Sequence, residues 1–554
     1  MALSLFQLNS AYEATLTLPE NSHSSPAEYL QGADLGFDRR VLAALVLLIL
    51  IGLGFRVCQL GAIGFAEDEV NKVNAVRAYE RGDITANAEH PMLMKIFMFA
   101  SVKIARAVKG EGGYSDEVVF RLPNAIFGAL TVVPLFLLTT AFFNRWTGLL
   151  AAGFWSVGVN AITLNRVGKE DTLLVFFMLF ACYFYLRAKQ TDTRQSKVRN
   201  KNYLLSGISF GLMMASKYFP HYLGLNSLYH HYARVRRREP GEPSGKTSMV
   251  FYIAMAVAFL IANPSVLLPE VWEYLRAYMG EKLLVHSGYL MGEQLFQNKM
   301  SRSPFWGMPI YFYFLFIAIK IPLIVLAAFL GGLVISVKRW RHPGHAFVLF
   351  MLFFWIVPYS LAGAKWLRYT LSLMPFIYMC AAVGVFQIIR LLTSRLNGAP
   401  VRAIAVTVVL LLCMVWPAVA AYVEAPHYGL YTNSLASRYK GYFFPHDEFY
   451  DDGLREAIKL VCDTAPPGAM IVHETPAATG YYLEKLKRTD LNSKALSAPD
   501  FEVTQISGPT YIIVQRGRTY FENREKIKVV RSKFRLIHEE KVNGLTAAEV
   551  FATQ

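Results

Sequence analysis

Three consecutive carboxylates, Glu67, Asp68 and Glu69, stand in the segment GFAEDEVNKV, directly after the first long apolar run of the chain. Adjacent carboxylates repel one another unless cations or a reaction require them. One interpretation is the solvated start of a helix, because Asp and Glu are favoured at the positive end of the helix dipole. The other is acid–base chemistry at the boundary between lipid and water, in which a carboxylate takes the proton of a reacting hydroxyl.

A second charged group lies between two apolar runs, in the segment NRVGKEDTLL, and contains Arg166, Lys169, Glu170 and Asp171. Each charge would cost roughly 2.5–3.5 kcal/mol at the bilayer centre. The group must therefore lie at the membrane rim or line a polar cavity, and an ordinary charged hairpin turn is the alternative. Further cations stand at the ends of other apolar runs, where each alone is also typical of an interfacial anchor: Lys217, Lys365 and Arg368.

Two other segments carry further candidate residues. His90 and Lys95 stand in EHPMLMKI, where Pro91 suits the first turn of a helix and His90 could equally cap it. His286 and Tyr289 stand in VHSGYLMGEQLF, for which plain loop structure is the alternative.

The composition indicates which elements must position these residues. The chain has 554 residues, of which 54% are hydrophobic and 17% charged, and its mean hydropathy is +0.31. These values are too apolar for a soluble protein of this size. The net charge of +16 comes from short basic clusters between apolar runs, which is a pattern of membrane orientation rather than of nucleic-acid binding. The five cysteines lie far apart and predict neither a disulfide framework nor a Cys-x-x-Cys metal site.

A membrane-spanning helix needs about 20 mostly apolar residues. The hydropathy pattern predicts eleven spans: 41–60, 121–142, 147–165, 171–187, 203–216, 219–233, 249–268, 307–336, 344–362, 369–390 and 401–422. The stretch 91–107 is apolar but carries three basic residues. If it crossed the bilayer, every basic cluster after it would move outside, against the positive-inside rule. We therefore predict an amphipathic helix that lies along the membrane surface.

This arrangement places the N-terminus in the cytoplasm. Loop 61–120, the link 166–170 and all residues after about 423 then share the non-cytoplasmic face, which Lys217, Lys365 and Arg368 also reach. Carboxylates and cations would thus meet at one membrane surface, as expected where a base works beside an anionic phosphate.

The chain becomes mixed and polar after the last predicted span. AMIVHE and TYIIVQ indicate strands between helical patterns at 450–463 and 476–487, so we expect a small α/β domain outside the membrane. The predicted organisation is a cytoplasmic tail at 1–40, a transmembrane module at 41–422 and an extracytoplasmic domain at 423–554. The lead-in to that domain is either a sugar or metal site or a solvated linker, and it concentrates His427, His446, Asp447, Glu448, Asp451 and Asp452 among aromatic residues.

The order of the motifs resembles the protein O-mannosyltransferase and aminoarabinose transferase superfamily, whose members are glycosyltransferases of the C-type fold. The matching positions, which cover about residues 60–390, are Asp68 and Glu69 in EDEV, HPMLMK with Met92 in place of a proline, Arg166 to Asp171, GLMMASK ending at Lys217, and Arg368, Tyr369 and Pro375. The resemblance implies a polytopic helical membrane protein and a sugar donor carried on polyprenyl phosphate. Neither an Asp-x-Asp triplet nor a Gly-rich phosphate loop is present, so nothing supports a nucleotide-sugar site of the soluble kind.

The resemblance also implies roles for the candidate residues. Asp68 is the expected general base of an inverting transfer to an acceptor hydroxyl, with Glu69 or Asp171 orienting the acceptor or a divalent cation, whose presence stays open. The expected contacts to the donor phosphate are Arg166, Lys217, Lys95 and Arg368, and the candidates for acceptor contact are His90, His286 and Tyr289.

The sequence leaves the transferred group open between a hexose and a pentose, and the acceptor open between protein, lipid and glycan. We expect a multi-pass protein of a bacterial inner membrane. A transporter or flippase for a lipid-linked or anionic solute is the alternative. It favours inverted repeats and charges near the bilayer midplane, whereas the acidic groups of this sequence are predicted to cluster at one face. A scaffold subunit without activity is a third alternative.

Overall fold

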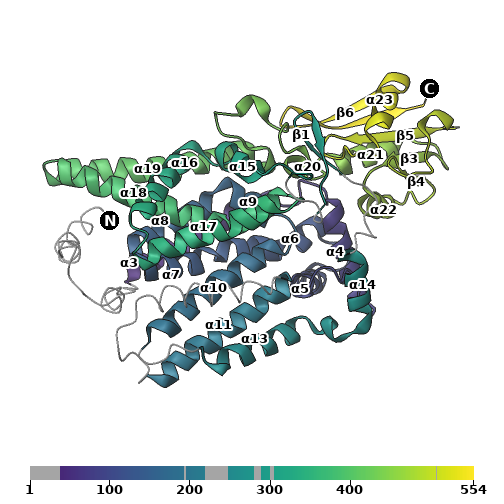
Figure 1. Cartoon of the computed structure of the whole chain (residues 1–554). Helices are drawn as coiled ribbons and strands as arrows, with labels where there is room; N and C mark the ends of the chain where they lie inside the picture. Colours follow the sequence, from purple (N-terminus) through teal and green to yellow (C-terminus); the bar gives the residue numbers. More distant parts are fainter. Residues whose placement is uncertain are drawn as a thin grey trace.

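The computed structural model describes residues 38–191, 195–218, 247–279, 288–299, 305–506 and 508–553. A bundle of long apolar helices carries the C-terminal sheet at one end (Figure 1). Within the described residues, six helices are long and apolar enough to cross a membrane, or up to seven if one bent pair counts as a span. The predicted number of eleven spans is therefore not confirmed, and the predicted span 219–233 lies outside the described residues.

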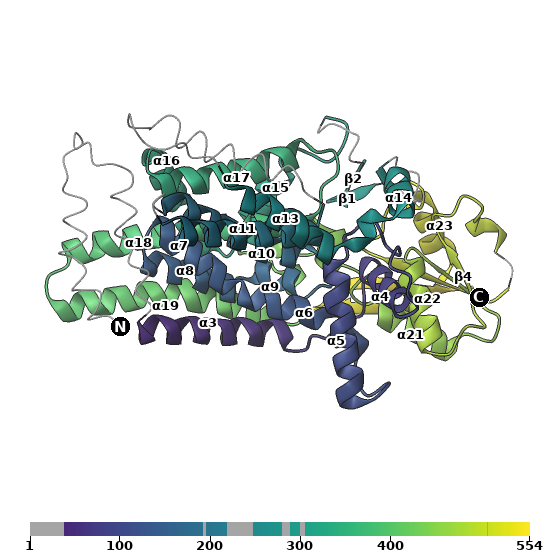
Figure 2. The ribbon, with the colours of Figure 1, turned by 90° about the horizontal axis from the view of Figure 1, so that it is seen from below.

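The bundle helices lie close to most of the predicted spans. In the first half they are α3 (Arg39–Val57), α6 (Asp116–Leu130), α7 (Val132–Phe142), α8 (Arg145–Val157), α9 (Val159–Asn165), α10 (Asp171–Gln190), α11 (Ser196–Ser216) and α13 (Met249–Ala262). In the second half they are α15 (Phe312–Lys320), α16 (Leu323–Lys338), α17 (Pro343–Leu361), α18 (Met374–Arg395) and α19 (Ala399–Glu424). The links that follow α3, α9 and α17 all lie at the end that carries the C-terminal sheet (Figures 1 and 2).

Proline and glycine interrupt helices that hydropathy predicts to be continuous. The predicted span 307–336 is divided into α15 and α16 at Pro322, which has no N–H to donate to a helix. Helices α8 and α9 meet at Gly158 with a bend of 58°. A Cβ atom there would lie 2.2 Å from the Tyr378 hydroxyl, so only glycine fits. Helix α13 ends at Ala262, before Asn263-Pro264, rather than at the predicted residue 268.

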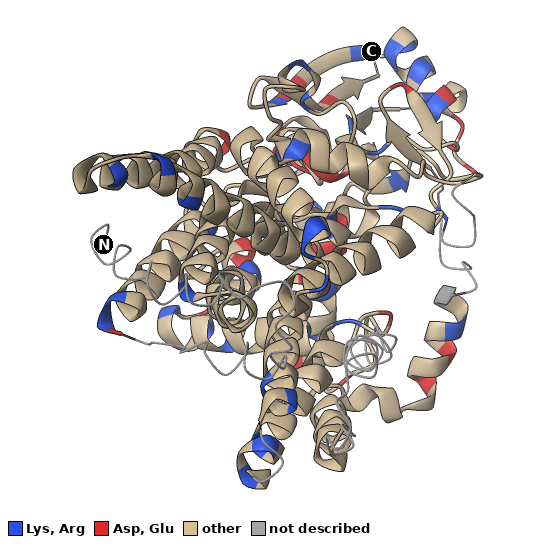
Figure 3. Ribbon diagram, turned by 60° about the vertical axis from the view of Figure 1, so that its left-hand side comes forward, with Lys and Arg blue, Asp and Glu red and all other residues tan. Residues whose placement is uncertain are grey.

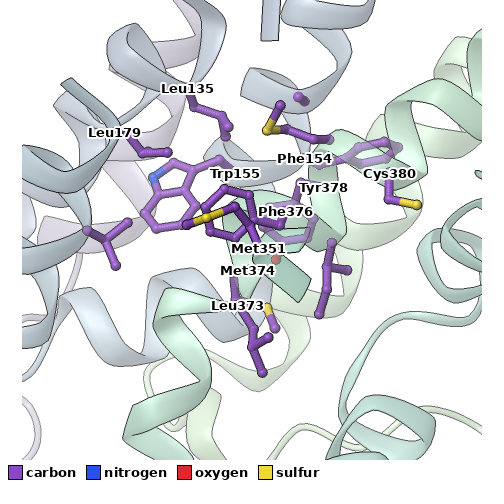
Figure 4. Close-up of a cluster of buried hydrophobic side chains, with 14 of the residues drawn as sticks. Leu135, Phe154, Trp155, Leu179, Met351, Leu373, Met374, Phe376, Tyr378 and Cys380 are labelled. Carbon is purple, nitrogen blue, oxygen red and sulfur yellow. The ribbon is translucent and has the colours of Figure 1, made fainter. Parts of the chain in front are cut away.

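Buried aromatic and aliphatic side chains from both halves of the bundle pack together in its centre (Figure 4). Trp155, Phe376 and Leu135 are each fully buried there. The Trp155 indole Nε1 donates to the Gly128 carbonyl at 2.7 Å, which satisfies the one polar atom of this side chain. The close packing fixes the helix ends from which the polar residues of the links project.

Shorter elements cover the end of the bundle near the sheet: α4 (Glu67–Glu80), α5 (Leu93–Lys109), α14 (Pro269–Met279), the hairpin of β1 (Tyr289–Met291) and β2 (Gln294–Phe296), and the 3-10 turn η3 (Leu367–Ser372). Helix α5 runs across the direction of the long helices (Figure 2). It buries Met94, Met98 and Val102 along one face. Helix α5 is therefore amphipathic, and its position along a membrane surface stays a prediction.

The C-terminal part contains a five-stranded sheet of order β4-β3-β5-β7-β6. Its elements are α20 (Pro445–Phe449), α21 (Leu454–Thr464), β3 (Met470–His473), α22 (Pro476–Lys485), β4 (Asn492–Ala495), β5 (Thr510–Gln515), α23 (Arg524–Lys533), β6 (Arg535–Val542) and β7 (Leu545–Ala552). Strand β3 pairs in parallel with β4 and β5, and β7 pairs antiparallel with β5 and β6. The predicted strands AMIVHE and TYIIVQ are β3 and β5.

Basic residues mark the helix ends on the opposite side of the bundle from the sheet (Figure 3). Among the described residues these positions include Arg187, Lys189, Lys338, Arg339, Arg390, Arg395 and Arg402. The two ends of the bundle therefore differ in charge, because the end beside the sheet combines cations with most of the buried carboxylates.

Candidate active site

The three carboxylates of α4 point in three directions, because successive residues of a helix are about 100° apart. Glu67 accepts from the backbone N–H groups of Ala477 and Ala478 at 2.9 and 2.8 Å. Glu69 pairs with Arg121 at 2.6 Å. The carboxylate of Asp68 lies 2.5 Å from Lys169 and 2.7 Å from Arg368. Separate cationic and N–H partners thus relieve the repulsion within the triplet.

Glu69 is buried and takes a structural position. Its two oxygens accept from Arg121 Nε and Nη2 at 2.8 and 2.6 Å, from the Gly168 N–H at 2.7 Å and from the Ala66 N–H at 3.1 Å. A Cβ atom at Gly168 would lie 2.7 Å from the Met98 methyl and 3.3 Å from a Glu69 oxygen, so glycine permits this close approach. The contacts of Glu69 therefore anchor α4, whereas the resemblance implied contact with an acceptor or a cation.

Asp68 is the member of the triplet that remains accessible, with 42% of its side chain exposed. Burial of the carboxylate group favours its neutral form, but Lys169, Arg368 and Lys72 outweigh that effect and hold the pKa of Asp68 well below its usual range. Burial, together with the nearby Arg368, lowers the pKa of Lys169 to about 8. Asp68 is thus an ionised carboxylate at neutral pH, held between two cations.

A second layer of charges supports this group. Lys72 lies 3.0 Å from the buried Glu170 and donates to the Asp68 carbonyl at 3.2 Å. His90 Nδ1 lies 3.7 Å from the same Glu170 oxygen, and the imidazole is 19% exposed. Burial holds the pKa of His90 well below its usual value, so the ring is neutral at physiological pH. His90 thus faces the charged cluster from its second layer, beside Glu170 rather than Asp68.

Asp171 and Lys217 form a further ion pair at 2.6 Å beside the same cluster. The Lys217 ammonium also lies 4.5 Å from the centre of the Tyr369 ring. One Asp171 oxygen, Oδ2, is buried and has no hydrogen-bond partner among the described residues. The pair joins the start of α10 to the end of α11 and lies next to the turn that carries Arg368.

Two of the cations predicted to hold a phosphate are engaged elsewhere. Arg166 donates to four carbonyls at the C-terminal end of α3, those of Phe55, Arg56, Cys58 and Gln59, at 2.7–3.1 Å. Lys95 donates to the carbonyls of the preceding loop at residues 86, 87 and 90. Burial lowers the pKa of Lys95 to about 7. These two basic side chains satisfy backbone acceptors that the sequence pattern cannot reveal. Arg166 also lines the cavity described below, and the phosphate contacts of Arg166 and Lys95 stay predictions.

Tyr289 and its hairpin lie against the segment that follows the last bundle helix. The Tyr289 hydroxyl donates to Asp447 at 2.5 Å, and burial raises the pKa of Asp447 to about 6. This contact places Tyr289 behind Asp447, which lines the cavity described below. The other candidate of the same loop, His286, lies outside the described residues.

A cavity with about 1040 Å³ of open space, its mouth included, lies between the bundle and the 426–452 segment. Lys169, Arg368 and Asp171 contribute to its wall, and its other lining residues include Asn160, Lys320, Leu367, Tyr428, Asp447, Glu448, Tyr450 and Asp452. Lys320 pairs with the buried Glu448 at 2.8 Å. The cations that hold Asp68 therefore also face this cavity.

Sequence reasoning omitted several of these residues from the candidate site. Lys169 was noticed only as part of a charged turn, and Lys72 was not singled out although it stands one helical turn after Asp68. Lys320 carried a usable signal, because an ionisable residue inside an apolar span is itself an indication of a functional or paired position. For Asp447 and Glu448, the sequence left a sugar or metal site and a solvated linker as alternatives.

The side chains of the site show whether a divalent cation could bind there. Among the described residues, no group of three or more His, Cys, Asp or Glu side chains could hold a metal ion. Asp68 and Glu69 each face positively charged side chains instead, which repel a cation. These residues do not fit a metal site, and the chemistry considered below uses none.

Comparison with known proteins gives a family match and several structural matches. The family model described as dolichyl-phosphate-mannose-protein mannosyltransferase matches residues 89–268, a range that includes Asp171 and Lys217. The crystal structure of ArnT from Cupriavidus metallidurans in the apo state aligns with a TM-score of 0.50 at 12% identity, over 94% of this chain and 98% of that chain. The apo oligosaccharyltransferase of Archaeoglobus fulgidus aligns with a TM-score of 0.51 at 12% identity, over 86% of this chain and 70% of that chain.

The chain has the C-type glycosyltransferase fold. The predicted resemblance to the protein O-mannosyltransferase and aminoarabinose transferase superfamily is thereby confirmed. A structure of the archaeal oligosaccharyltransferase tethered with an acceptor peptide aligns equally, with a TM-score of 0.50 at 11% identity over 86% of this chain and 69% of that chain. Comparison with curated protein sequences found no match. In this C-type fold, the Asp68 cluster lies at the end of the bundle that carries the C-terminal sheet.

The ion pairs of Asp68 predict a pH dependence of stability. Because its pKa is depressed in the folded protein, the stability that Asp68 contributes is present above about pH 4, the pKa of an unfolded Asp, and is lost as the pH falls through the folded value. Arg368→Gln removes one cation, so the folded pKa rises and this contribution becomes smaller. We expect Arg368→Gln to lower the melting temperature at pH 7 and to reduce the difference in melting temperature between pH 7 and pH 3.

The exposed Arg395, at the opposite end of the bundle, provides the control. Arg395→Gln should leave the pH dependence of the melting temperature unchanged. Identical acid profiles for Arg368→Gln and the unmodified protein would show that the pairing with Asp68 contributes nothing to folding.

Proposed function

We propose that this protein transfers one sugar from a polyprenyl-phosphate carrier to an acceptor hydroxyl, with inversion at the anomeric carbon. The observation that carries this proposal is the position of Asp68, an accessible carboxylate between Lys169 and Arg368, in a chain with the C-type glycosyltransferase fold. The match to the dolichyl-phosphate-mannose-protein mannosyltransferase family supports a donor carried on a polyprenyl phosphate.

The proposed reaction is a single displacement. The acceptor oxygen attacks the anomeric carbon, the bond from that carbon to the phosphate oxygen breaks, and the carrier leaves as a polyprenyl phosphate. Asp68 takes the proton of the acceptor hydroxyl as the new glycosidic bond forms. A weakly basic carboxylate suffices, because the hydroxyl loses its proton late, when bond formation to the sugar has already made it acidic.

Lys169 and Arg368 are the cations best placed to meet the charge that develops on the leaving phosphate, because both line the cavity beside Asp68. Lys217 is a third candidate, since it lies near Arg368 on the Tyr369 ring. Preorganised cations of this kind stabilise a leaving phosphate without rearrangement. When the phosphate contacts these cations, they stabilise the Asp68 carboxylate less, so the pKa of Asp68 rises and it becomes a stronger base.

The charge difference between the two ends of the bundle supports an orientation. We propose that the basic end faces the cytoplasm by the positive-inside rule, and that the candidate active site faces the opposite, periplasmic or extracellular compartment. The C-terminal residues from 423 onward would form an extracytoplasmic domain on the transmembrane module at 41–422. An isoprenoid-linked donor in the outer leaflet would then reach the site from the bilayer.

The test is a transfer assay with the purified full-length protein in lipid nanodiscs. Synthetic polyprenyl phosphates that carry a hexose or a pentose are supplied with peptide, glycolipid and oligosaccharide acceptors, and the anomeric configuration of the product is determined by NMR. We expect one donor and acceptor pair to give a product of inverted configuration. Retention of configuration would contradict the single displacement. Uptake of the lipid-linked solute into proteoliposomes without any covalent product would instead favour a transporter.

A further inference from the structure

The parallel part of the C-terminal sheet points its carboxyl edge toward α4. In open sheets with parallel strands, this edge is where ligands bind. Strand β3 ends at His473, immediately before the N-terminus of α22, and strand β5 ends at Gln515. The N-terminal N–H groups of α22 are of the kind that bind an anion in other proteins. Here the carboxylate of Glu67 occupies them, at 2.9 and 2.8 Å from the nitrogens of Ala477 and Ala478.

The contact between the two helix ends is reciprocal. Just as Glu67 caps α22, Asp451 caps α4, because its Oδ2 accepts from the backbone N–H of Glu67 at 3.0 Å. A free helix N-terminus leaves such N–H groups without partners. Both contacts are made by Glu67, and Glu69 is anchored by Arg121. Asp68 lies between these two residues in the sequence. Its neighbours on both sides are therefore fixed by buried or half-buried polar contacts.

The C-terminal part holds Asp451 from the opposite side. Arg518 donates through Nε to Asp451 Oδ1 at 2.6 Å and through Nη2 to Oδ2. Gln515 Nε2 donates to the same Oδ1 at 3.0 Å. Such a two-pronged contact between guanidinium and carboxylate fixes orientation as well as distance. The Asp451 side chain is only 2% exposed, so water competes little for these bonds.

The backbone at this turn adopts a conformation that non-glycine residues rarely use. Tyr450 and Asp451 both have positive φ angles, 48° and 63°. Such a backbone conformation persists only where surrounding contacts impose it, and residues that adopt it cluster at functional sites. The turn also places Tyr450 in the wall of the cavity.

We propose that Glu67, Asp451 and Arg518 are positioning residues, through which the C-terminal part of the chain fixes the height and direction of Asp68 on α4. This inference rests on the proposed function, because it assigns the three residues to the geometry of the proposed base. The C-terminal sheet is then a component of the active site, although it contributes no group to the reaction itself. A displacement of about 1 Å in a catalytic group is enough to cost about 100-fold in rate.

The test uses Glu67→Gln and Asp451→Asn in the full-length protein, each of which preserves side-chain shape. Hydrogen–deuterium exchange of the backbone amides of residues 64–70 is measured together with kcat and the donor KM. We expect faster exchange in both variants, with kcat lowered about 10- to 100-fold and the donor KM changed less than about 2-fold. Arg518→Lys keeps the positive charge but not the two-pronged contact, and it should give an intermediate loss of kcat.

The matched control is Glu484→Gln. Glu484 pairs with Arg77 at 3.0 Å between the same two helices, but this pair is 64% and 40% exposed. The control should change neither exchange nor kcat. Exchange at the level of the unmodified protein in Glu67→Gln and Asp451→Asn would overturn the proposal, and so would full kcat despite faster exchange. Absence of transfer by the unmodified protein would refute the proposed function instead, because the exchange measurement needs no turnover.

Discussion

Asp68→Asn is expected to lower kcat by about 10²- to 10⁴-fold, the usual contribution of general base catalysis. Asparagine preserves the volume and one oxygen of the side chain but cannot accept the proton of the acceptor hydroxyl. Lys169 and Arg368 lose their negative partner in this variant, so both cations become free for a phosphate. We therefore expect the donor to bind at least as tightly as before. Initial transfer rates over a range of donor concentrations measure both effects.

The control for this experiment is Asp83→Asn. Asp83 follows the C-terminal end of α4 in an exposed turn, where it accepts from the Thr85 N–H at 2.9 Å, and it does not line the cavity. This variant should keep full activity. Unchanged turnover in Asp68→Asn would remove Asp68 from the mechanism and with it the proposed displacement.

Glu69→Ala is expected to cost about 3–5 kcal/mol of stability, because it leaves the buried Arg121 guanidinium without its carboxylate. The Arg121 side chain is 5% exposed and that of Glu69 is 2% exposed, so water cannot replace the missing partner. The variant also leaves the Gly168 N–H without its acceptor. Thermal unfolding in detergent, followed by tryptophan fluorescence, should show a large decrease in melting temperature.

Two further variants distinguish an anchoring role from a catalytic one. Glu69→Ala combined with Arg121→Met should recover part of the stability, because no unpaired charge remains buried. Glu80→Ala removes a carboxylate at the other end of α4, where Glu80 lies 3.0 Å from the half-exposed Arg106, and should cost at most about 1 kcal/mol. A normal melting temperature for Glu69→Ala with abolished transfer would instead make Glu69 part of the reaction.

Hydropathy and charge predicted the architecture better than the length of individual helices. Apolar runs locate the helices, because burial in lipid or in a helix bundle requires apolar side chains on every turn. The breaks at Gly158 and Pro322 were not predicted, because a hydropathy average ignores a single missing N–H or side chain. The basic clusters that follow 91–107 predicted a helix along the membrane surface at that position, because a crossing there would move them all outside. The structure has a helix there, α5, and its position at the membrane surface stays a prediction.

The sequence predicted which types of residue form the candidate site, but it did not predict which of them contact one another. Asp68 and Arg368 are 300 residues apart in the sequence, and no local pattern reports that they touch. Arg166 had the same signal as Arg368, namely a cation at the end of an apolar segment, and Lys95 stood within the apolar stretch 91–107. In the folded chain, these two cations are satisfied by backbone carbonyls.

The sequence by itself determined that the chain forms a multi-helix membrane protein, with carboxylates and cations in links that can share one end of the bundle. Those properties depend on composition along the chain, which hydropathy and charge record directly. Only the tertiary structure decided that Glu67 caps a helix of the C-terminal part, that Glu69 is anchored by Arg121, and that Asp68 stays accessible between two cations. The physical reason is that the partner of a buried charge is selected by distance in space, which depends on how all the helices pack.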